Sequence, residues 1–420
     1  MAQTSLWQNR DFVRLWTGQA ISQVGSRITR TALPFAAVIT LDAGPLQMGI
    51  LSGAAAASVL IFGLFAGAWA DRLRRRPILI WTDLARAAVL TTAPVAAMRH
   101  SLTMTHLYIV AAAAGLLTVL FDVSYQAYVP SLVERENILQ ANAKLALSES
   151  VAEVSGPGIA GFLVTALTAP IAILFDAASF LVSAVSISLV RTPEPPPETR
   201  HPDSHIGREI AEGLRVSWRN PYLRAMVLRA ATAALFMGFF ASLYPLFTVK
   251  VLNLSPSLIG IVVASGGAFA LAGAAVSERL VRGLGLGRAL LCAVLFTNFT
   301  TFLHPLAHGP AALACAFLVA GQLGDFAWPA INITETSLRQ ASAPPRLLGR
   351  VNSAMNLLFN GFIPVGAFAG GALASVTGVR TAMFVGGAGY LVSTLWLVFS
   401  PIPALRELPA STNEASSAVT

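Results

Sequence analysis

Two carboxylic acids, Glu149 and Glu153, stand four residues apart in a stretch that is otherwise rich in small apolar residues. This spacing places both side chains on the same face of a helix. Because an apolar environment favours the protonated form of a carboxylic acid, we expect these two residues to take up and release protons. The alternative is a static ion pair with one of three arginines that also fall within apolar runs, Arg27, Arg30 and Arg229.

A charged loop with the sequence GAWADRLRRRP extends from Gly67 to Pro77. A basic loop beside an apolar run is ordinary for a membrane protein and accounts for the arginines. It does not account for Asp71, which stands one turn after Gly67 at the end of the run. Glycine allows helices to approach closely, and an aspartate at a helix terminus can accept hydrogen bonds from free N–H groups. The loop is therefore expected to hold two helices together.

Gly156, Pro157 and Gly161 follow the two acids in the same apolar run. Proline frees a carbonyl group and bends a helix, and glycine permits close packing. Glycines at such spacing also form ordinary packing faces, as between Gly366 and Gly370. The motif alone therefore leaves packing and a role in conformational change open.

The composition of the chain determines what kind of element carries these residues. Of the 420 residues, 55% are hydrophobic and only 11% are charged, and the mean hydropathy is +0.67. A soluble domain is about 25% charged. Continuous apolar runs, rather than alternating segments, indicate membrane-spanning helices and not a β-barrel. We find no nucleotide-binding loop and no catalytic constellation, so an enzyme is not expected.

The net charge of +8 does not require a nucleic-acid partner. In the predicted topology most of the basic residues fall on one side of the membrane, with Arg99, Lys250 and Arg380 on the other. This asymmetry places both termini in the cytoplasm and the chain in the inner membrane. The two cysteines, Cys292 and Cys315, lie within apolar runs and do not indicate a disulfide framework.

Polar breaks divide the sequence into two halves and a linker. We expect a six-helix bundle over 1–190, a linker over 191–220, a second six-helix bundle over 221–401 and a cytoplasmic tail over 402–420. The linker begins with a proline-rich segment and ends in an amphipathic helix, whose apolar face is predicted to carry Ile206, Ile210, Leu214 and Trp218. The twelve transmembrane helices are predicted near 13–40, 47–70, 78–98, 104–128, 142–166, 170–190, 221–249, 256–278, 286–305, 310–334, 351–375 and 379–400.

The two halves resemble each other when they are offset by about 203 to 211 residues. Pro34 corresponds to Pro245, and Gly49, Asp122 and Tyr125 correspond to Gly260, Asp325 and Trp328. Each match is weak, but all occur in the same order. Two parallel six-helix repeats with a substrate path between them are typical of transporters.

The loop that begins at Gly67 resembles the signature G-x-x-x-D-R-x-G-R-R of the major facilitator superfamily, with Arg74 at the position of its second glycine. Nearly the whole chain is similar to one branch, bacterial exporters such as the enterobactin exporter and the macrolide-efflux pumps. The segments NRDFVRLWTGQAISQVGSRITRTALP, DLARA, AYVPSLVERENILQANAKLALSES, EGLRVSWRNPYLRAMVL and LLGRVNSAMNLL carry this resemblance.

The resemblance implies an all-α membrane protein with the major facilitator fold. It implies that Asp71 docks near the start of the eleventh helix and that Arg75 pairs with Asp122, which closes the cytoplasmic side. The residues assigned to this latch are Gly67, Asp71, Arg72, Arg75, Arg76, Asp83, Arg86 and Asp122. Asp325, with Glu278, Arg279 and Arg282, is the expected counterpart in the second half.

Gly156, Pro157 and Gly161 resemble the helix-5 motif of superfamily exporters that work by antiport. We therefore expect a monomeric, proton-coupled exporter of a bulky amphipathic molecule such as a macrolide, with the proton gradient as its energy source and no cofactor or metal. Its other partners would be membrane lipids, and the residues for proton coupling or substrate binding would be Arg27, Arg30, Glu149, Glu153, Arg229 and Asp325. A siderophore or metabolite exporter, a lysophospholipid flippase and a non-transporting receptor or assembly partner are the alternatives.

Aromatic residues and histidines have less specific interpretations. Aromatic side chains on helices 1, 7 and 10 either line a central cavity or pack between helices: Trp16, Phe236, Phe239, Phe240, Tyr244, Phe326 and Trp328. Four histidines are expected to be solvated in outer loops: His100, His106, His304 and His308.

Overall fold

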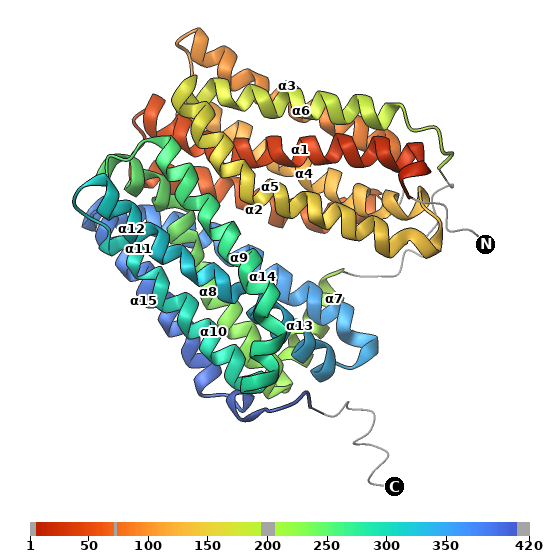
Figure 1. Ribbon diagram of the computed structural model, residues 1–420, viewed down its shortest axis with the longest axis vertical. Coiled ribbons are helices and arrows are strands. Elements are labelled where there is room, and N and C mark those ends of the chain that lie inside the picture. Colours follow the sequence, from red (N-terminus) through yellow and green to blue (C-terminus); the bar gives the residue numbers. More distant parts are fainter. Residues whose placement is uncertain (1–5, 71–73, 195–205, 410–420) are drawn as a thin grey trace. The chain divides into compact units, whose positions relative to one another are not determined.

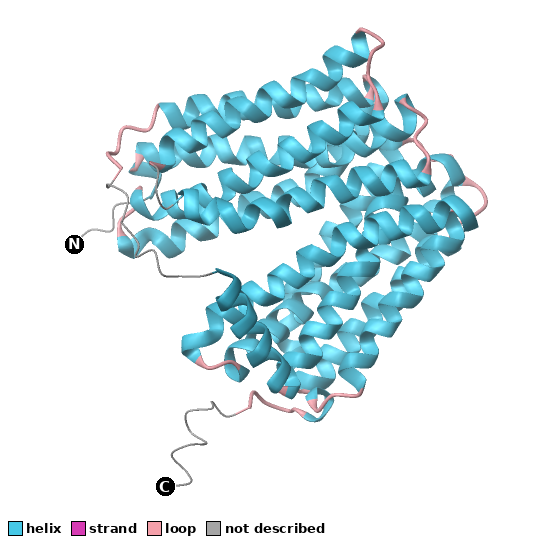
Figure 2. Cartoon of the chain, turned by 180° about the vertical axis from the view of Figure 1, so that it is seen from behind, coloured by secondary structure: helices cyan, strands magenta, loops and turns pink. Residues whose placement is uncertain are grey.

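The computed structural model describes residues 6–70, 74–194 and 206–409. These described residues are almost entirely helical, without a strand (Figure 2). The long helices of the first half are α1 (Arg10–Phe35), α2 (Pro45–Ala70), α3 (Arg75–Met98), α4 (Met104–Tyr128), α5 (Ile138–Ala166) and α6 (Ala169–Ser188). The second half contains α7 (Ile206–Arg219), α8 (Pro221–Leu246), α9 (Pro256–Leu284), α10 (Leu286–Thr301), α11 (Leu303–Leu306), α12 (Ala311–Gln322), α13 (Trp328–Ser342), α14 (Leu348–Thr377) and α15 (Val379–Val398).

The chain divides into two compact units. The first unit comprises residues 1–201 together with 254–264, the beginning of α9. In it α1 packs against α5 and α6, α3 packs against α4 and α6, and α2 packs against α4 (Figure 1). A buried cluster that includes Phe12, Leu79 and Tyr128 joins the ends of α1, α3 and α4.

The second unit comprises residues 202–253 and 265–420. Its central helix α8 packs against α14 and α15, and the short α7 packs against α14. A methyl group added at Gly213 of α7 would overlap the carbonyl of Arg350 in α14, so glycine is needed for this approach. The buried face of α7 therefore includes Gly213 and Ser217, whereas Trp218 is 60% exposed. Small residues thus make the contact with α14, and Trp218 of the predicted apolar face lies outside that contact.

The sequence repeat reappears as repeated local structure. Pro34 lies near the end of α1 and is followed by a π-helical turn, η2 (Ala36–Thr40). Pro245 lies in the same place in α8 and is followed by a π-helical turn, η5 (Phe247–Val251). Because proline removes a backbone donor, it alters the hydrogen-bond ladder of the turn around it. Both turns lead to a residue with positive φ, Asp42 at 51° and Asn253 at 51°.

The two halves also share the way in which a helix begins, as α1 and α8 show. The side chain of Asn9 accepts hydrogen bonds from the N–H groups of the first turn of α1 and donates to the carbonyl of Leu132 at 2.8 Å. Asn220 does the same for α8 and donates to the carbonyl of Ser342 at 3.1 Å. Asparagine at this position satisfies donors that a helix start leaves free. The same device thus fixes the start of α1 and of α8.

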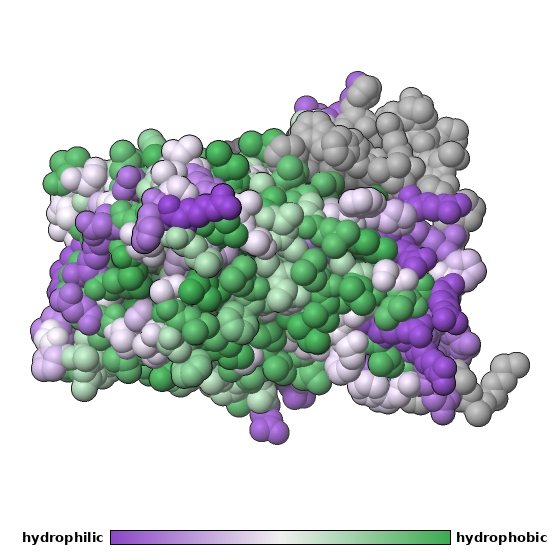
Figure 3. Space-filling model, turned by 90° about the horizontal axis from the view of Figure 1, so that it is seen from above, coloured by the Kyte–Doolittle hydropathy of each residue, from purple (hydrophilic) through white to green (hydrophobic). Residues whose placement is uncertain are grey.

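Nine helical segments in the described part of the chain are long and apolar enough to span a membrane. The helices α1, α2 and α5 are not among these nine, so the predicted number of twelve spans stays a prediction. Figure 3 shows apolar residues over the middle of the helix surface and hydrophilic residues gathered toward both ends. The predicted helix 310–334 differs most from the structure: α12 and α13 are joined by a 3-10 turn, η6 (Leu323–Ala327), and the segment continues to Ser342.

Candidate functional site

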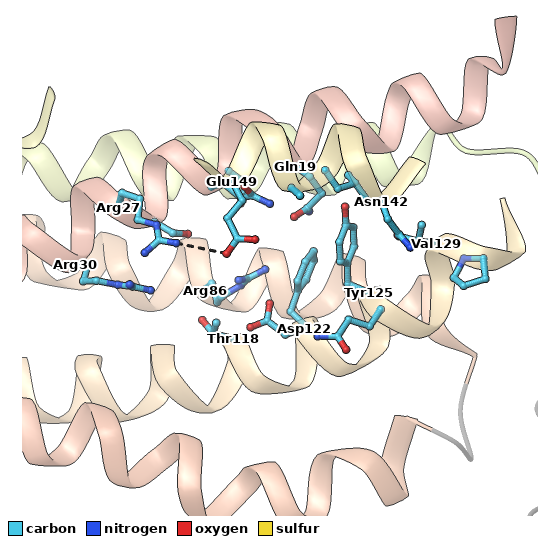
Figure 4. A pocket seen from close by; sticks show the side chains of 18 residues that line it. Gln19, Arg27, Arg30, Arg86, Thr118, Asp122, Tyr125, Val129, Asn142 and Glu149 are labelled. Carbon is cyan, nitrogen blue, oxygen red and sulfur yellow. Dashed lines mark ion pairs between the residues drawn. The ribbon is translucent and has the colours of Figure 1, made fainter. Parts of the chain in front are cut away.

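A pocket of about 620 Å³ lies within the first unit (Figure 4). The helices α1, α3, α4 and α5 supply its charged side chains. Three of them are arginines, Arg27, Arg30 and Arg86, and two are acids, Asp122 and Glu149. Polar residues complete much of the lining, among them Gln19, Ser22, Gln23, Ser26, Thr118, Tyr125, Gln126 and Asn142.

Arg27 of α1 contacts both acids of α5. Its Nη2 lies 3.7 Å from Glu149 Oε1, and its Nη1 pairs with Glu153 Oε2. The two acids share one helix face, as the spacing predicted, and the partner is one of the three arginines that the sequence offered. The structure therefore contains the ion pair of the alternative interpretation.

Glu149 and Glu153 are more accessible than expected. Their side chains are 64% and 54% exposed, whereas the side chain of Arg27 is only 14% exposed. The protein itself therefore does not bury the two carboxylates. Their expected role in proton uptake and release stays a prediction.

Gly156 sets the distance between Arg27 and α5. A methyl group added at this glycine would overlap Arg27 Cβ and lie 3.1 Å from its Cγ. Gly161 and Gly260 provide a second close approach, since a methyl group on either would overlap a backbone carbonyl, that of Pro256 or of Pro157. All of these residues belong to the first unit, which includes residues 254–264. The glycines of the helix-5 motif are therefore close-packing residues.

Asp83 and Arg86 form a buried ion pair inside α3. The Arg86 guanidinium lies between two rings, with its Cζ 4.2 Å from the centroid of Phe121 and 4.0 Å from that of Phe180. The side chains of Asp83 and Arg86 are 0% and 4% exposed. Because α3 begins at Arg75, Arg86 lies about 16 Å along its axis and not at its inner end. The assignment of this pair to the latch stays a prediction, since residues 71–73 of the loop lie outside the described residues.

The expected pair between Arg75 and Asp122 is not formed among the described residues. Asp122 lines the pocket beside Arg86 (Figure 4). The Arg75 N–H instead donates to Glu194 Oε1 at 2.6 Å, and the Arg76 N–H donates to Glu194 Oε2 at 3.2 Å. A carboxylate at the start of a helix satisfies its free donors and suits its dipole.

The remaining residues assigned to the latch are placed only in part. The Arg76 guanidinium donates to the carbonyls of Ile187 and Ser188 at the end of α6. Gly67 belongs to α2, and the expected roles of Asp71 and Arg72 fall outside the described residues.

In the second unit Arg229 of α8 pairs with Glu335 of α13. Its Nε and Nη2 donate to the two carboxylate oxygens, each at 2.7 Å. The sequence analysis missed Glu335, because the predicted helix ended at residue 334. The signal was the run TETSLRQ, whose helical continuation keeps this acid at the bundle.

Asp325 does not join Glu278 and Arg282 as the expected counterpart of the latch. A methyl group added at Gly266 of α9 would overlap Asp325 Oδ2, so Asp325 lies beside that position. Glu278 is twelve residues further along α9, about 18 Å away along the helix axis. There it forms an exposed pair with Arg282 at 3.4 Å.

The aromatic residues of α8 pack between helices of the second unit. Phe236 fills the space at Gly389, and Phe239 contacts Gly370 and Gly386. His304 is 7% exposed and its Nε2 lies 3.3 Å from Gln322 Oε1, so the expectation of a solvated loop histidine is wrong for this residue. The α11 turn brings it inward against Phe240 and Tyr244.

Known proteins resemble this chain over most of their length. Macrolide efflux protein A of Streptococcus pyogenes is 25% identical over 410 residues, which cover 94% of this chain and 97% of the relative. Multidrug efflux pump Tap of Mycolicibacterium fortuitum is 27% identical over 400 residues, which cover 91% and 93% of the two chains. A bacterial homologue of the iron transporter ferroportin, solved in its inward-facing state, matches with a TM-score of 0.74 at 20% identity and covers 94% of this chain and 99% of that one, so the two share a fold.

The family match extends over nearly the whole chain. Residues 3–418 match the family described as transmembrane secretion effector. The chain belongs to the transmembrane secretion effector family of the major facilitator superfamily, and is a multi-pass membrane transporter rather than an enzyme.

Proposed function

We propose that this transporter exports a bulky amphipathic small molecule, such as a macrolide or another drug, in exchange for protons. It would work as a monomer by alternating access, with both termini in the cytoplasm. The names of the two efflux relatives support the direction of transport and the kind of substrate. The pocket of the first unit offers charged, polar and aromatic groups to such a molecule.

The observation that carries the proposal is the contact of Arg27 with both Glu149 and Glu153. Two carboxylates and one guanidinium have a net charge of −1, and one bound proton makes the group neutral. Protonation of one acid leaves Arg27 paired with the other and weakens the link between α1 and α5. A change of charge in a membrane-spanning bundle is costly enough to favour one conformation over another.

Efflux from energised cells that lack their main pumps tests this proposal. We expect extrusion of a macrolide or dye that stops when a protonophore is added. Replacement of both acids, Glu149→Gln with Glu153→Gln, should abolish the protonophore-sensitive part of the efflux. Each single substitution leaves one carboxylate for Arg27 and should reduce this efflux less. Glu278→Gln removes an exposed acid of α9 and serves as the control. Full proton-dependent efflux by the double variant would show that another group carries the proton.

A second candidate is export of an anionic molecule, such as a siderophore or an acidic metabolite. Arg30 favours it, because this arginine lines the pocket and makes no hydrogen bond or ion pair among the described residues. Arg27 and Arg86, in contrast, are held by acids. Guanidinium groups bind carboxylates through two hydrogen bonds. If the substrate is anionic, Arg30→Gln should raise its half-saturating concentration about tenfold or more, with little change for a neutral or cationic drug.

A further inference from the structure

A groove of about 630 Å³ lies within the second unit between α7, α8 and α14. Its floor is apolar and is formed by Leu214, Val227, Leu228, Ala231, Leu358 and Phe362. Three arginines are also among its lining residues, Arg215 and Arg219 on α7 and Arg224 on α8. The groove thus combines an apolar lining with three cationic side chains.

The three arginines have the same charge. All three are exposed, and none makes a hydrogen bond or an ion pair among the described side chains. Of the two acids on α7, Glu212 is engaged with Arg350, and the side chain of Glu209 lies outside the described residues. Arg215 and Arg219 are four residues apart, a spacing at which like charges destabilise a helix slightly. An anion placed between them and Arg224 relieves this repulsion.

The position of the groove indicates where that anion comes from. Arg224 and Val227 belong to the first two turns of α8, which begins the segment Pro221–Val251, one of those long and apolar enough to span a membrane. Trp218 lines the groove and is 60% exposed, and tryptophan is enriched at the boundary between headgroups and hydrocarbon. The arginines therefore lie at headgroup level and the apolar floor continues toward the hydrocarbon.

We propose that this groove binds one anionic phospholipid, with its phosphate against Arg215, Arg219 and Arg224 and an acyl chain along the apolar floor. Guanidinium groups pair with phosphate through two hydrogen bonds, and basic pockets at the cytoplasmic ends of helices select anionic headgroups. The bound lipid joins α7 to α8 and α14, and so fastens the end of the linker to the second unit. This inference does not depend on which molecule is exported.

Tryptophan quenching tests the proposal with the full-length protein reconstituted in vesicles. The probes are phosphatidylglycerol and phosphatidylcholine, each with brominated acyl chains, which quench a tryptophan on contact. We expect stronger quenching by the brominated phosphatidylglycerol, and the difference should disappear in Trp218→Phe. Free phosphate has no acyl chain, so its addition cannot produce this signal.

The triple variant Arg215→Gln, Arg219→Gln and Arg224→Gln should lose the preference for the anionic lipid. Each arginine at a membrane surface contributes about fivefold in affinity, so the amount of lipid needed for half of the excess quenching should rise about a hundredfold. The matched control removes three arginines from another part of the same unit, Arg282, Arg288 and Arg406. Equal quenching by the two lipids in the native protein, or equal loss in the control triple, would overturn the proposal. Unfolding midpoints of both triples report whether each is folded.

Discussion

Arg229 and Glu335 are joined by two hydrogen bonds of 2.7 Å, from Nε and Nη2 to the two carboxylate oxygens. Their side chains are 11% and 16% exposed, so both charges are largely removed from water. The pair fastens α13 to α8, the central helix of the second unit. Neither residue can be replaced alone without leaving the other charge without its partner.

We therefore predict opposite outcomes for single and paired replacement. Arg229→Met or Glu335→Leu alone should cost about 3 kcal/mol or more, because an uncompensated charge stays in the bundle. The double variant should recover most of this loss, since apolar side chains of similar size suit the site. The measurement is the unfolding midpoint of the purified protein in detergent.

The exposed pair of α9, Glu278 and Arg282, is the control for that experiment. Its side chains are 80% and 70% exposed, and pairs of this kind contribute roughly 0–1 kcal/mol. Glu278→Leu and Arg282→Met should therefore leave the midpoint nearly unchanged. If the double variant at Arg229 and Glu335 were as unstable as the sum of the singles, the pair would not act as a coupled unit.

Gly156→Ala should impair both stability and proton-coupled efflux. The added methyl group overlaps Arg27 Cβ, an atom fixed to the backbone of α1 that cannot rotate away. Forcing extra volume into a packed contact costs about 1–3 kcal/mol, and here it also moves Arg27 from the two acids. Gly158→Ala is the matched control, because its methyl group would meet only Ala264 Cβ, at 4.0 Å. The explanation fails if the two variants behave alike.

Much of this architecture was predictable because it depends on backbone chemistry. Pro34 and Pro245 impose the same π-helical turn, and Asn9 and Asn220 cap the same helices, whatever surrounds them. The positions of Glu149 and Glu153 on one face follow from helix geometry in the same way. Such features are local, and the sequence specifies them directly.

The ion-pair partner of a charged residue was less predictable, because it depends on where a helix ends and on which face of the helix packs inward. A helix boundary placed eight residues too early removed Glu335 from consideration, and with it the partner of Arg229. The inward position of Asp83 and Arg86 depends on the rings of Phe121 and Phe180, which come from other helices. How far the protein buries Glu149 and Glu153 depends on the neighbours of α5, which residue spacing does not record.

Asp11 is expected to fasten the start of the linker to α1. Its Oδ2 accepts hydrogen bonds from the N–H groups of Arg191 and Thr192 and from the Thr192 hydroxyl. Asp11→Ala should therefore speed hydrogen–deuterium exchange at these two amides at neutral pH. Arg14→Ala is the comparison, because it removes one interaction with Asp11 and one with the Leu189 carbonyl but leaves the acceptors of both N–H groups. Unchanged exchange in Asp11→Ala would contradict this role.

The same site has a defined pH dependence. Burial tends to raise the pKa of Asp11, but hydrogen bonds from Thr192, from the Arg191 amide and from Arg14 outweigh it, so the pKa lies below its usual range. A lowered pKa in the folded protein means that the contribution is fully present above the unfolded-state pKa of about 3.9 and is lost as the pH falls through the folded value. Linker docking should thus be constant from neutral pH to about pH 5, and should weaken only in more acidic solution.

The contribution of Arg86 to stability should depend on the shape of its guanidinium group as well as on its charge. The flat group lies against Phe121 on one side and Phe180 on the other, and Asp83 pairs with it in the same α3. Lysine keeps the charge but cannot stack between two rings. Arg86→Lys should therefore destabilise the protein, and Phe180→Leu should destabilise it through lost packing as well as lost stacking. In the double variant the stacking is lost only once, so its cost should fall short of the sum of the singles by about 0.5–2 kcal/mol. Additive costs in this cycle, measured from unfolding midpoints, would mean that Arg86 is held by Asp83 alone.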